Sequence, residues 1–153
     1  MNSSVLLPII ISLVTCSLIM FFVWLWAKSI KNAGVVDIFW SFNFPVIALI
    51  VYCFSDGFQT RKIMLTAMVL LWGIRLGTHL AMRVVSHLNE EEGRYAQLRK
   101  DWAPRAEKKF FWFFQAQGFS NVLLAAPFLL SLKTRRMNFR YWNILDFRFG
   151  LLQ

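Results

Sequence analysis

The stretch that decides the fold runs from Val5 to Ala27 and reads VLLPIIISLVTCSLIMFFVWLWA. It contains no charged residue, and it is longer than the roughly 20 residues that an α-helix needs to cross a bilayer core about 30 Å thick. The core of a secretory signal is shorter, about 7–15 residues, and follows basic residues, which are absent here. We therefore expect residues 5–27 to form an uncleaved membrane helix.

Three further stretches have comparable length and apolar character, with polar loops between them. They comprise residues 35–54, 63–82 and 110–132. The sequence predicts an all-α fold in which residues 1–153 form a single multi-pass membrane domain, a bundle of four transmembrane helices. Residues 141–153 turn apolar again after the start of a basic tail (133–153), which resembles the beginning of a fifth span.

The composition agrees with this assignment. Hydrophobic residues make up 58% of the 153 residues and charged residues only 16%, against about 45–50% and about 25% in soluble domains. This composition argues against a soluble enzyme. Seventeen Lys and Arg against eight Asp and Glu give a net charge of +9. In a chain this apolar, we expect that charge to face anionic lipid headgroups and cytoplasmic loops, and we expect no nucleic-acid partner.

The distribution of Lys and Arg predicts the orientation. The two connections at residues 28–34 and 83–109 carry nine of them, whereas the 55–62 connection carries two. By the positive-inside rule, the N-terminus lies outside and the 83–109 loop lies in the cytoplasm. Within that loop, rings and Leu recur at helical spacing over residues 84–102, which predicts an amphipathic helix at the interface, ended by Pro104.

The third stretch carries polar side chains on one face. Arg75, His79 and Arg83 recur every four residues, so they share a stripe about 80° wide. Gly73 and Gly77 lie on the opposite face, at a spacing typical of close helix packing. Two interpretations stay open for the stripe. It lines a polar cavity, or its long side chains snorkel toward the loop, because Arg75 is only about 10 Å from the end of the stretch.

The second and fourth stretches also carry polar residues. Asp37 either pairs with an Arg or His of the third stretch, which lowers the cost of burying both charges, or caps its own helix. Gln117 and Asn121 are one turn apart, which is typical of hydrogen bonding between membrane helices. Two histidines without nearby cysteines predict no metal site.

Several motifs in order resemble one membrane family, the branch of unknown function within the steroid 5-alpha-reductase-like proteins. The resemblance covers roughly residues 33–132. It rests on VDIFW (36–40), LWGIRL (71–76) followed by His79 and Arg83, GRYAQLR (93–99), and FQAQG (114–118).

The resemblance implies a helical oxidoreductase that uses NADPH to reduce a carbon–carbon double bond conjugated to a carbonyl, in a steroid-like or other lipid. This chemistry needs a proton donor near the carbonyl and cations near the cofactor phosphates. The resemblance gives Asp37 and His79 as catalytic candidates. Its cofactor-binding candidates are Arg75, Arg83, Arg94, Tyr95 and Arg99. Its substrate-binding candidates are Trp40, Gln115 and Gln117.

One family motif is not found. Members continue through further helices, where a run resembling Arg-His-Pro-x-Tyr-x-Gly-Glu helps build the cofactor site. Both histidines of this sequence, His79 and His87, are followed by Leu. We therefore expect a truncated member, inactive unless a complementing chain or a second copy supplies the missing half.

Two other functions stay open. One is methyl transfer to an isoprenylated cysteine from S-adenosylmethionine, which uses a similar membrane architecture. The other is non-enzymatic: a small helical protein that assembles with another membrane protein through the face of Gly73 and Gly77.

Overall fold

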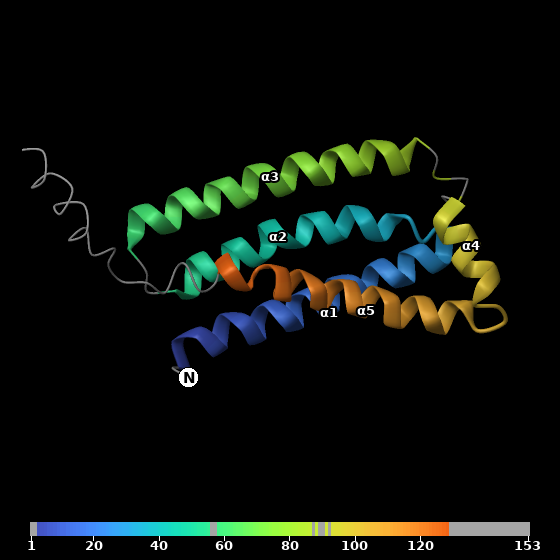
Figure 1. Cartoon of the computed structure of the whole chain (residues 1–153), viewed down its shortest axis with the longest axis horizontal. Helices are drawn as coiled ribbons and strands as arrows, with labels where there is room; N and C mark the ends of the chain where they lie inside the picture. Colours follow the sequence, from blue (N-terminus) through green and yellow to red (C-terminus); the bar gives the residue numbers. More distant parts are fainter. Residues whose placement is uncertain (1–2, 56–57, 87, 89–90, 92, 129–153) are drawn as a thin grey trace, which may run out of the picture.

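The computed structural model describes residues 3–55, 58–86, 88, 91 and 93–128. Every regular element in these ranges is an α-helix, which confirms the all-α prediction (Figure 1). The helices are α1 (Ser3–Ile30), α2 (Val35–Phe54), α3 (Gln59–Val85), α4 (Gly93–Asp101) and α5 (Ala106–Leu124). The four long helices run alongside one another, and the short α4 lies across the end where α1 ends and α2 begins (Figure 1).

Three helices, α1, α2 and α3, are long and apolar enough to cross a membrane. This is consistent with an integral membrane protein. The predicted count of four spans is not confirmed. α5 begins four residues before the predicted stretch 110–132 and so includes Glu107, Lys108 and Lys109, which lower its hydropathy. Residues 129–132, the basic tail and the start of a fifth span lie outside the described residues.

α2 is the central helix of the bundle. It contacts α1, α3 and α5, and α1 also packs along α5, whereas α3 packs chiefly on α2. Consequently 56% of the apolar part of α2 is buried inside the bundle, whereas only 17% of the apolar part of α3 is buried. Within the described residues α3 is therefore an edge helix, and most of its surface is not covered by another helix.

The glycine face of α3 makes the contact with α2. A Cβ atom on Gly73 would lie 2.4 Å from Cδ of Pro45, and one on Gly77 would lie 2.8 Å from the ring of Phe42. Only glycine allows the two helices to approach so closely, which is how small residues promote packing in lipid. The predicted packing role is confirmed. Because α2 of the same chain occupies this face, the interpretation of the face as an assembly surface for another protein is wrong.

The connection between α3 and α5 differs from the prediction. A single interfacial helix over residues 84–102 is wrong, because α3 continues to Val85 and a separate helix, α4, spans Gly93–Asp101. Residues 28–34 and the 83–109 connection lie at one end of the bundle (Figure 1). We call this the α4 end.

Side chains tie the α1–α2 turn to the connection that precedes α4. Asn32 accepts a 2.9 Å hydrogen bond from the backbone N–H of Gly34 and donates one of 3.1 Å to the carbonyl of Leu88. The backbone N–H of Ala33 donates to Glu91 Oε1 at 2.9 Å. These bonds satisfy backbone groups just before α2 and fix the connection against the bundle.

Candidate functional site

A cluster of polar side chains surrounds the carboxylate of Asp37 at the α4 end. Nη2 of Arg94 lies 3.2 Å from Asp37 Oδ2, and Nη2 of Arg83 lies 3.6 Å from the same oxygen. The hydroxyl of Tyr95 donates to Asp37 Oδ1 at 2.8 Å and accepts a 2.6 Å hydrogen bond from Arg94. The predicted pair between the second and third stretches is therefore present, with Arg83 as the partner of Asp37.

Tyr95 is the buried member of this cluster. Its side chain is fully buried, and its ring packs edge-on to Phe113 with centroids 6.2 Å apart. Burial raises the pKa of the Tyr95 hydroxyl, and the negative charge of Asp37 raises it further. The phenol therefore keeps its proton and remains a hydrogen-bond donor to the carboxylate.

The two arginines of the cluster remain accessible. The Arg83 and Arg94 side chains are 49% and 63% exposed, whereas Asp37 is 22% exposed. Each guanidinium carries five N–H donors in a planar fork. Accessible guanidinium groups of this kind suit phosphate oxygens.

A second ion-pair network holds α4 against α5. Arg99 makes two hydrogen bonds to Glu91, at 2.8 Å and 2.9 Å, and a third to Glu107 at 2.5 Å. Its guanidinium also lies over the ring of Phe110, 4.8 Å from the centroid. The hydrogen bonds that Arg99 donates to Glu91 raise the pKa of Arg99 above its ordinary value; burial opposes this shift, and Glu107 adds to it. Arg99 is thus engaged by two carboxylates.

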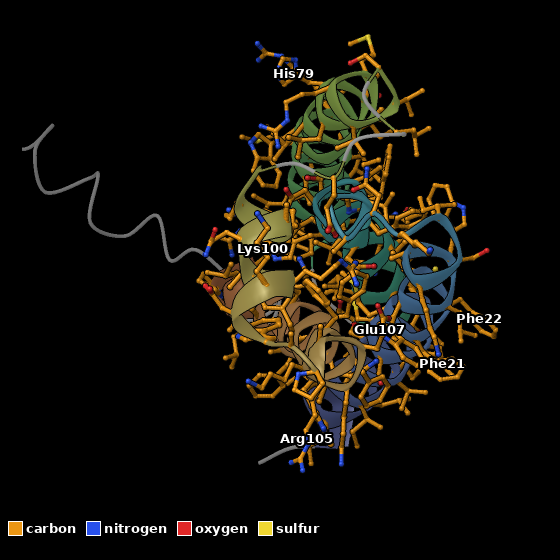
Figure 2. All side chains as sticks on the ribbon, turned by 90° about the vertical axis from the view of Figure 1, so that its right-hand side faces the viewer. Phe21, Phe22, His79, Lys100, Arg105 and Glu107 are labelled. Carbon is orange, nitrogen blue, oxygen red and sulfur yellow. The ribbon has the colours of Figure 1, made fainter. Side chains whose placement is uncertain are left out.

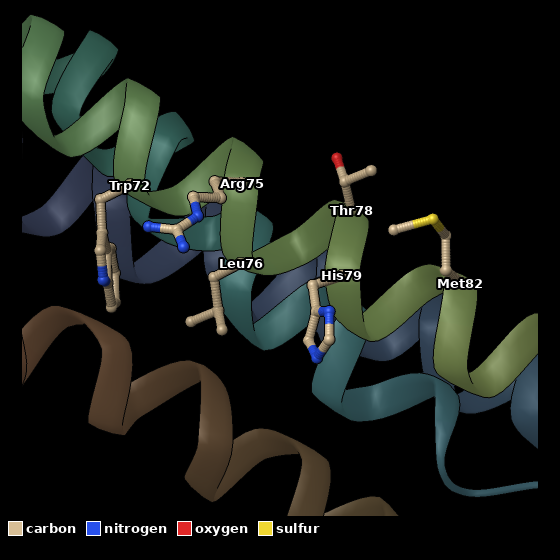
Figure 3. Close-up of a pocket in the computed structure, with 6 residues that line it drawn as sticks. All are labelled: Trp72, Arg75, Leu76, Thr78, His79 and Met82. Atoms are coloured by element: carbon tan, nitrogen blue, oxygen red, sulfur yellow. The ribbon is translucent and has the colours of Figure 1, made fainter.

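The polar stripe of α3 lines a cavity of about 610 Å³. Trp72, Leu76 and His79 project from α3 to the side on which α5 lies (Figure 3). Within the described part of the chain, Arg75 and His79 have neither an ion pair nor a hydrogen bond. The lining residues are Trp72, Arg75, Leu76, Thr78, His79 and Met82. All six residues belong to α3 and all but Leu76 are exposed, so the cavity is an open groove along one helix, and both interpretations of the stripe stay open.

The cavity and the cluster are connected through α3. Arg83 follows His79 by one helical turn on the same stripe, and it pairs with Asp37. Asp37 itself does not line the cavity. The structure therefore separates the two catalytic candidates: His79 lies on the cavity wall, whereas Asp37 lies within the ion-pair cluster at its end.

The three substrate-binding candidates do not line this cavity. The amide oxygen of Gln115 accepts a 2.7 Å hydrogen bond from Ser17 on α1. The indole N–H of Trp40 donates to the Ser120 hydroxyl at 3.2 Å, and that hydroxyl donates to the main-chain oxygen of Gln117 at 2.8 Å. Gln115 and Trp40 thus make interhelical contacts.

The predicted hydrogen bonding of Asn121 between helices is confirmed, but its partner Asn43 was missed by the sequence analysis. Asn43 on α2 donates to Asn121 on α5 at 3.0 Å, and Asn121 donates to the carbonyl of Trp40 at 2.9 Å. Both asparagines are almost completely buried. An Asn inside an apolar stretch was a usable signal for Asn43. No such signal singled out Glu91 from its neighbours in a run of three glutamates.

The fold and the site together define a helical protein with three potential membrane helices, a cationic cavity and an arginine-rich end. Residues 23–152 match the family described as "Protein of unknown function (DUF1295)", and the chain belongs to that family. No curated protein and no solved structure matches the chain.

Proposed function

We propose that this chain is a membrane protein of the steroid 5-alpha-reductase-like type, which binds NADPH and a lipid with a double bond conjugated to a carbonyl. The observation that carries the proposal is the continuous stripe of α3. Arg75 and His79 line the cavity along the apolar helix α3. Arg83 is the next residue of the stripe, and it belongs to the arginine cluster. Polar side chains within membrane helices usually mark such sites.

The cluster fits the phosphates of NADPH. Arg83 and Arg94 present accessible guanidinium groups from two helices, and Asp37 and Tyr95 hold Arg94 in place through bonds of 3.2 Å and 2.6 Å. Bound NADPH supplies the hydride that reduces the double bond at its β-carbon. The α4 end would face the cytosol, because its two connections carry nine Lys and Arg.

The α3 cavity fits the lipid. Its walls combine the apolar side chains of Trp72, Leu76 and Met82 with Arg75 and His79. In this proposal the Arg75 guanidinium stabilises the negative charge that develops on the carbonyl oxygen, and His79 delivers a proton to the α-carbon.

Two candidates lose their proposed roles in this arrangement. Asp37 accepts hydrogen bonds from Tyr95 and Arg94, so it serves to position these groups and not to donate a proton. Arg99 is held by Glu91 and Glu107, so it fixes α4 and does not contact phosphate.

Equilibrium binding of nicotinamide cofactors to the detergent-purified chain tests the proposal. We expect NADPH to bind more tightly than NADH, because the extra phosphate meets the arginine cluster. Arg94→Gln should weaken NADPH binding about tenfold, the equivalent of about 1.4 kcal/mol. Lys100→Gln, which removes an exposed cation on the same helix, should not. Equal affinities for NADPH and NADH would overturn the cofactor assignment.

A conjugated steroid enone tests the cavity. Its binding should change the fluorescence of Trp72, and Trp72→Phe should remove that change. His79→Gln should leave enone binding intact, and it should abolish the NADPH-dependent reduction that appears once a complementing chain or a second copy supplies the missing half. If an enone does not affect Trp72 emission, the α3 cavity is not the lipid site.

A further inference from the structure

The outward face of α5 changes from cationic to apolar along its length. Arg105, Lys108 and Lys109 lie at its beginning, Trp112 lies one turn further, and all four side chains are exposed. Spacings of three and four residues place them on one face of the helix. Phe119, seven residues after Trp112, continues that face and is 54% exposed.

The cationic side chains are accessible at the α4 end. Figure 2 shows Arg105 at the rim of the bundle, whereas Glu107 lies closer to its centre. Glu107 is also engaged by Arg99 at 2.5 Å. Lys109 Nζ lies 5.9 Å from the ring centroid of Trp102, so this cation stays close to an aromatic surface. Three exposed cations beside tryptophans form an anion-attracting patch where Trp commonly marks the membrane interface.

The apolar part of the same face leads into a groove between α1 and α5. Its volume is about 380 Å³. The Ser17–Gln115 hydrogen bond of 2.7 Å lies among its lining residues. The groove is lined by Leu13, Val14, Ser17, Leu18, Gln115 and Phe119.

Along this face the cations come first, then the indole, then the apolar groove. This order matches the headgroup, the ester groups and the acyl chains of a phospholipid. A rise of 1.5 Å per residue places Phe119 about 10 Å deeper than Trp112, within the reach of an acyl chain in one leaflet about 15 Å thick. In the described part of the chain, the indole N–H of Trp112 has no acceptor. It is therefore available to the ester oxygens that lie between a headgroup and its chains.

We propose that the outer face of α1 and α5 binds one phospholipid with an anionic headgroup. The phosphate and the headgroup charge lie against Arg105, Lys108 and Lys109, and an acyl chain occupies the groove beside Phe119. An anionic lipid is favoured over a zwitterionic one because the patch presents three cations and the carboxylate of Glu107 is already paired. The site lies apart from the α3 cavity, since it shares none of its lining residues.

Competition between two lipids with identical acyl chains tests the proposal. The detergent-solubilised full chain is titrated with equal amounts of phosphatidylglycerol and phosphatidylcholine, and the bound lipids are counted by native mass spectrometry. Phosphatidylglycerol should dominate in the unmodified chain. Each neutralised cation should reduce that preference about fivefold, so Lys108→Gln with Lys109→Gln should reduce it about 25-fold.

Two further variants separate the headgroup from the chain. Lys100→Gln removes an exposed cation of α4 and should leave the preference unchanged. Val14→Phe narrows the groove and should weaken both lipids equally. The proposal is overturned if the two lipids bind equally to the unmodified chain, or if Lys100→Gln lowers the preference as much as Lys108→Gln does.

Quenching of Trp112 gives a readout that does not depend on the lysine variants. Phosphatidylglycerol with brominated acyl chains should quench part of the tryptophan emission of the unmodified chain. Trp112→Phe should remove that part. Unchanged quenching in Trp112→Phe would place the lipid elsewhere and overturn the assignment.

Discussion

The hydroxyl of Tyr95 donates a 2.8 Å hydrogen bond to the carboxylate of Asp37, a residue 58 positions earlier in the chain. The bond joins α4 to the beginning of α2 and satisfies the polar atom of a fully buried side chain. It also places Arg94, the neighbour of Tyr95, 3.2 Å from the same carboxylate. The position of α4, and hence of the arginine cluster, therefore depends on this contact.

Tyr95→Phe should destabilise the folded chain by about 1.5–3 kcal/mol, because a hydrogen bond to a charged acceptor is lost in a buried place. Reversible unfolding in mixed detergent micelles, followed by circular dichroism, measures the change. Tyr52→Phe is the matched control, since the Tyr52 hydroxyl accepts a 2.9 Å hydrogen bond at an exposed site. Equal effects of the two variants would show that the Tyr95 contact does not hold α4.

The same contact predicts loss of stability in alkali. Burial and the charge of Asp37 raise the pKa of folded Tyr95 above the ordinary value of 10.0. The folded state then holds its proton more tightly than the unfolded state, so stability falls as the pH rises above about 10. Unfolding curves taken on both sides of this pH measure the decline. Tyr95→Phe should reduce it, and an identical decline in that variant would contradict the assignment.

Apolar length was enough to predict most of the fold. The stretch 35–54 coincides with α2, and 5–27 and 63–82 lie within α1 and α3. The predicted stretches stop short of the ends of α1 and α3. Both helices extend beyond their apolar part into polar residues, which include Lys28 in α1 and Arg61 in α3. The connection before α5 was predicted less well, because the break between Val85 and Gly93 depends on contacts such as that of Glu91 with Ala33. Those partners are 58 positions apart and share no local pattern.

The site could be predicted only in part for the same reason. A spacing of four residues was enough to place Arg75 and His79 on one face, and the cavity lies along that face. Spacing within one helix says nothing about a neighbouring helix. The resemblance gave Gln115 as a substrate-binding candidate, whereas its side chain pairs with Ser17 across the α1–α5 contact. Likewise, the roles of Tyr95 and Glu91 follow from where α4 packs.

Gly73→Ala should weaken the contact between α3 and α2. The added Cβ would lie 2.4 Å from Cδ of Pro45, inside van der Waals contact, and overpacking of this kind typically costs about 1–3 kcal/mol. Unfolding in mixed micelles measures the loss. Gly93→Ala is a matched control, because no atom lies within 4 Å of its Cβ position. If Gly73→Ala were as stable as Gly93→Ala, the close approach of the two helices would be wrong.

Arg75→Leu should separate function from stability. Arg75 has no ion pair or hydrogen bond within the described residues, so its removal deletes no polar contact there. The free energy of unfolding should change by no more than about 0.5 kcal/mol, as for other sites without partners. Membrane insertion should become easier, since a charged residue at a helix centre costs about 2.5–3.5 kcal/mol on insertion scales. Enone binding in the α3 cavity should be lost.

Arg99→Leu provides the comparison for that prediction. It removes a guanidinium bound to Glu91 at 2.8 Å and to Glu107 at 2.5 Å, so it should cost about 1.5–3 kcal/mol in unfolding free energy. Because Arg99 lies outside the α3 cavity, folded Arg99→Leu protein should still bind the enone. Unfolding in mixed micelles and Trp72 fluorescence give the two readouts on the same samples. If Arg75→Leu were destabilised as much as Arg99→Leu and kept its enone binding, Arg75 would be a structural residue, and the cavity would lose its proposed role.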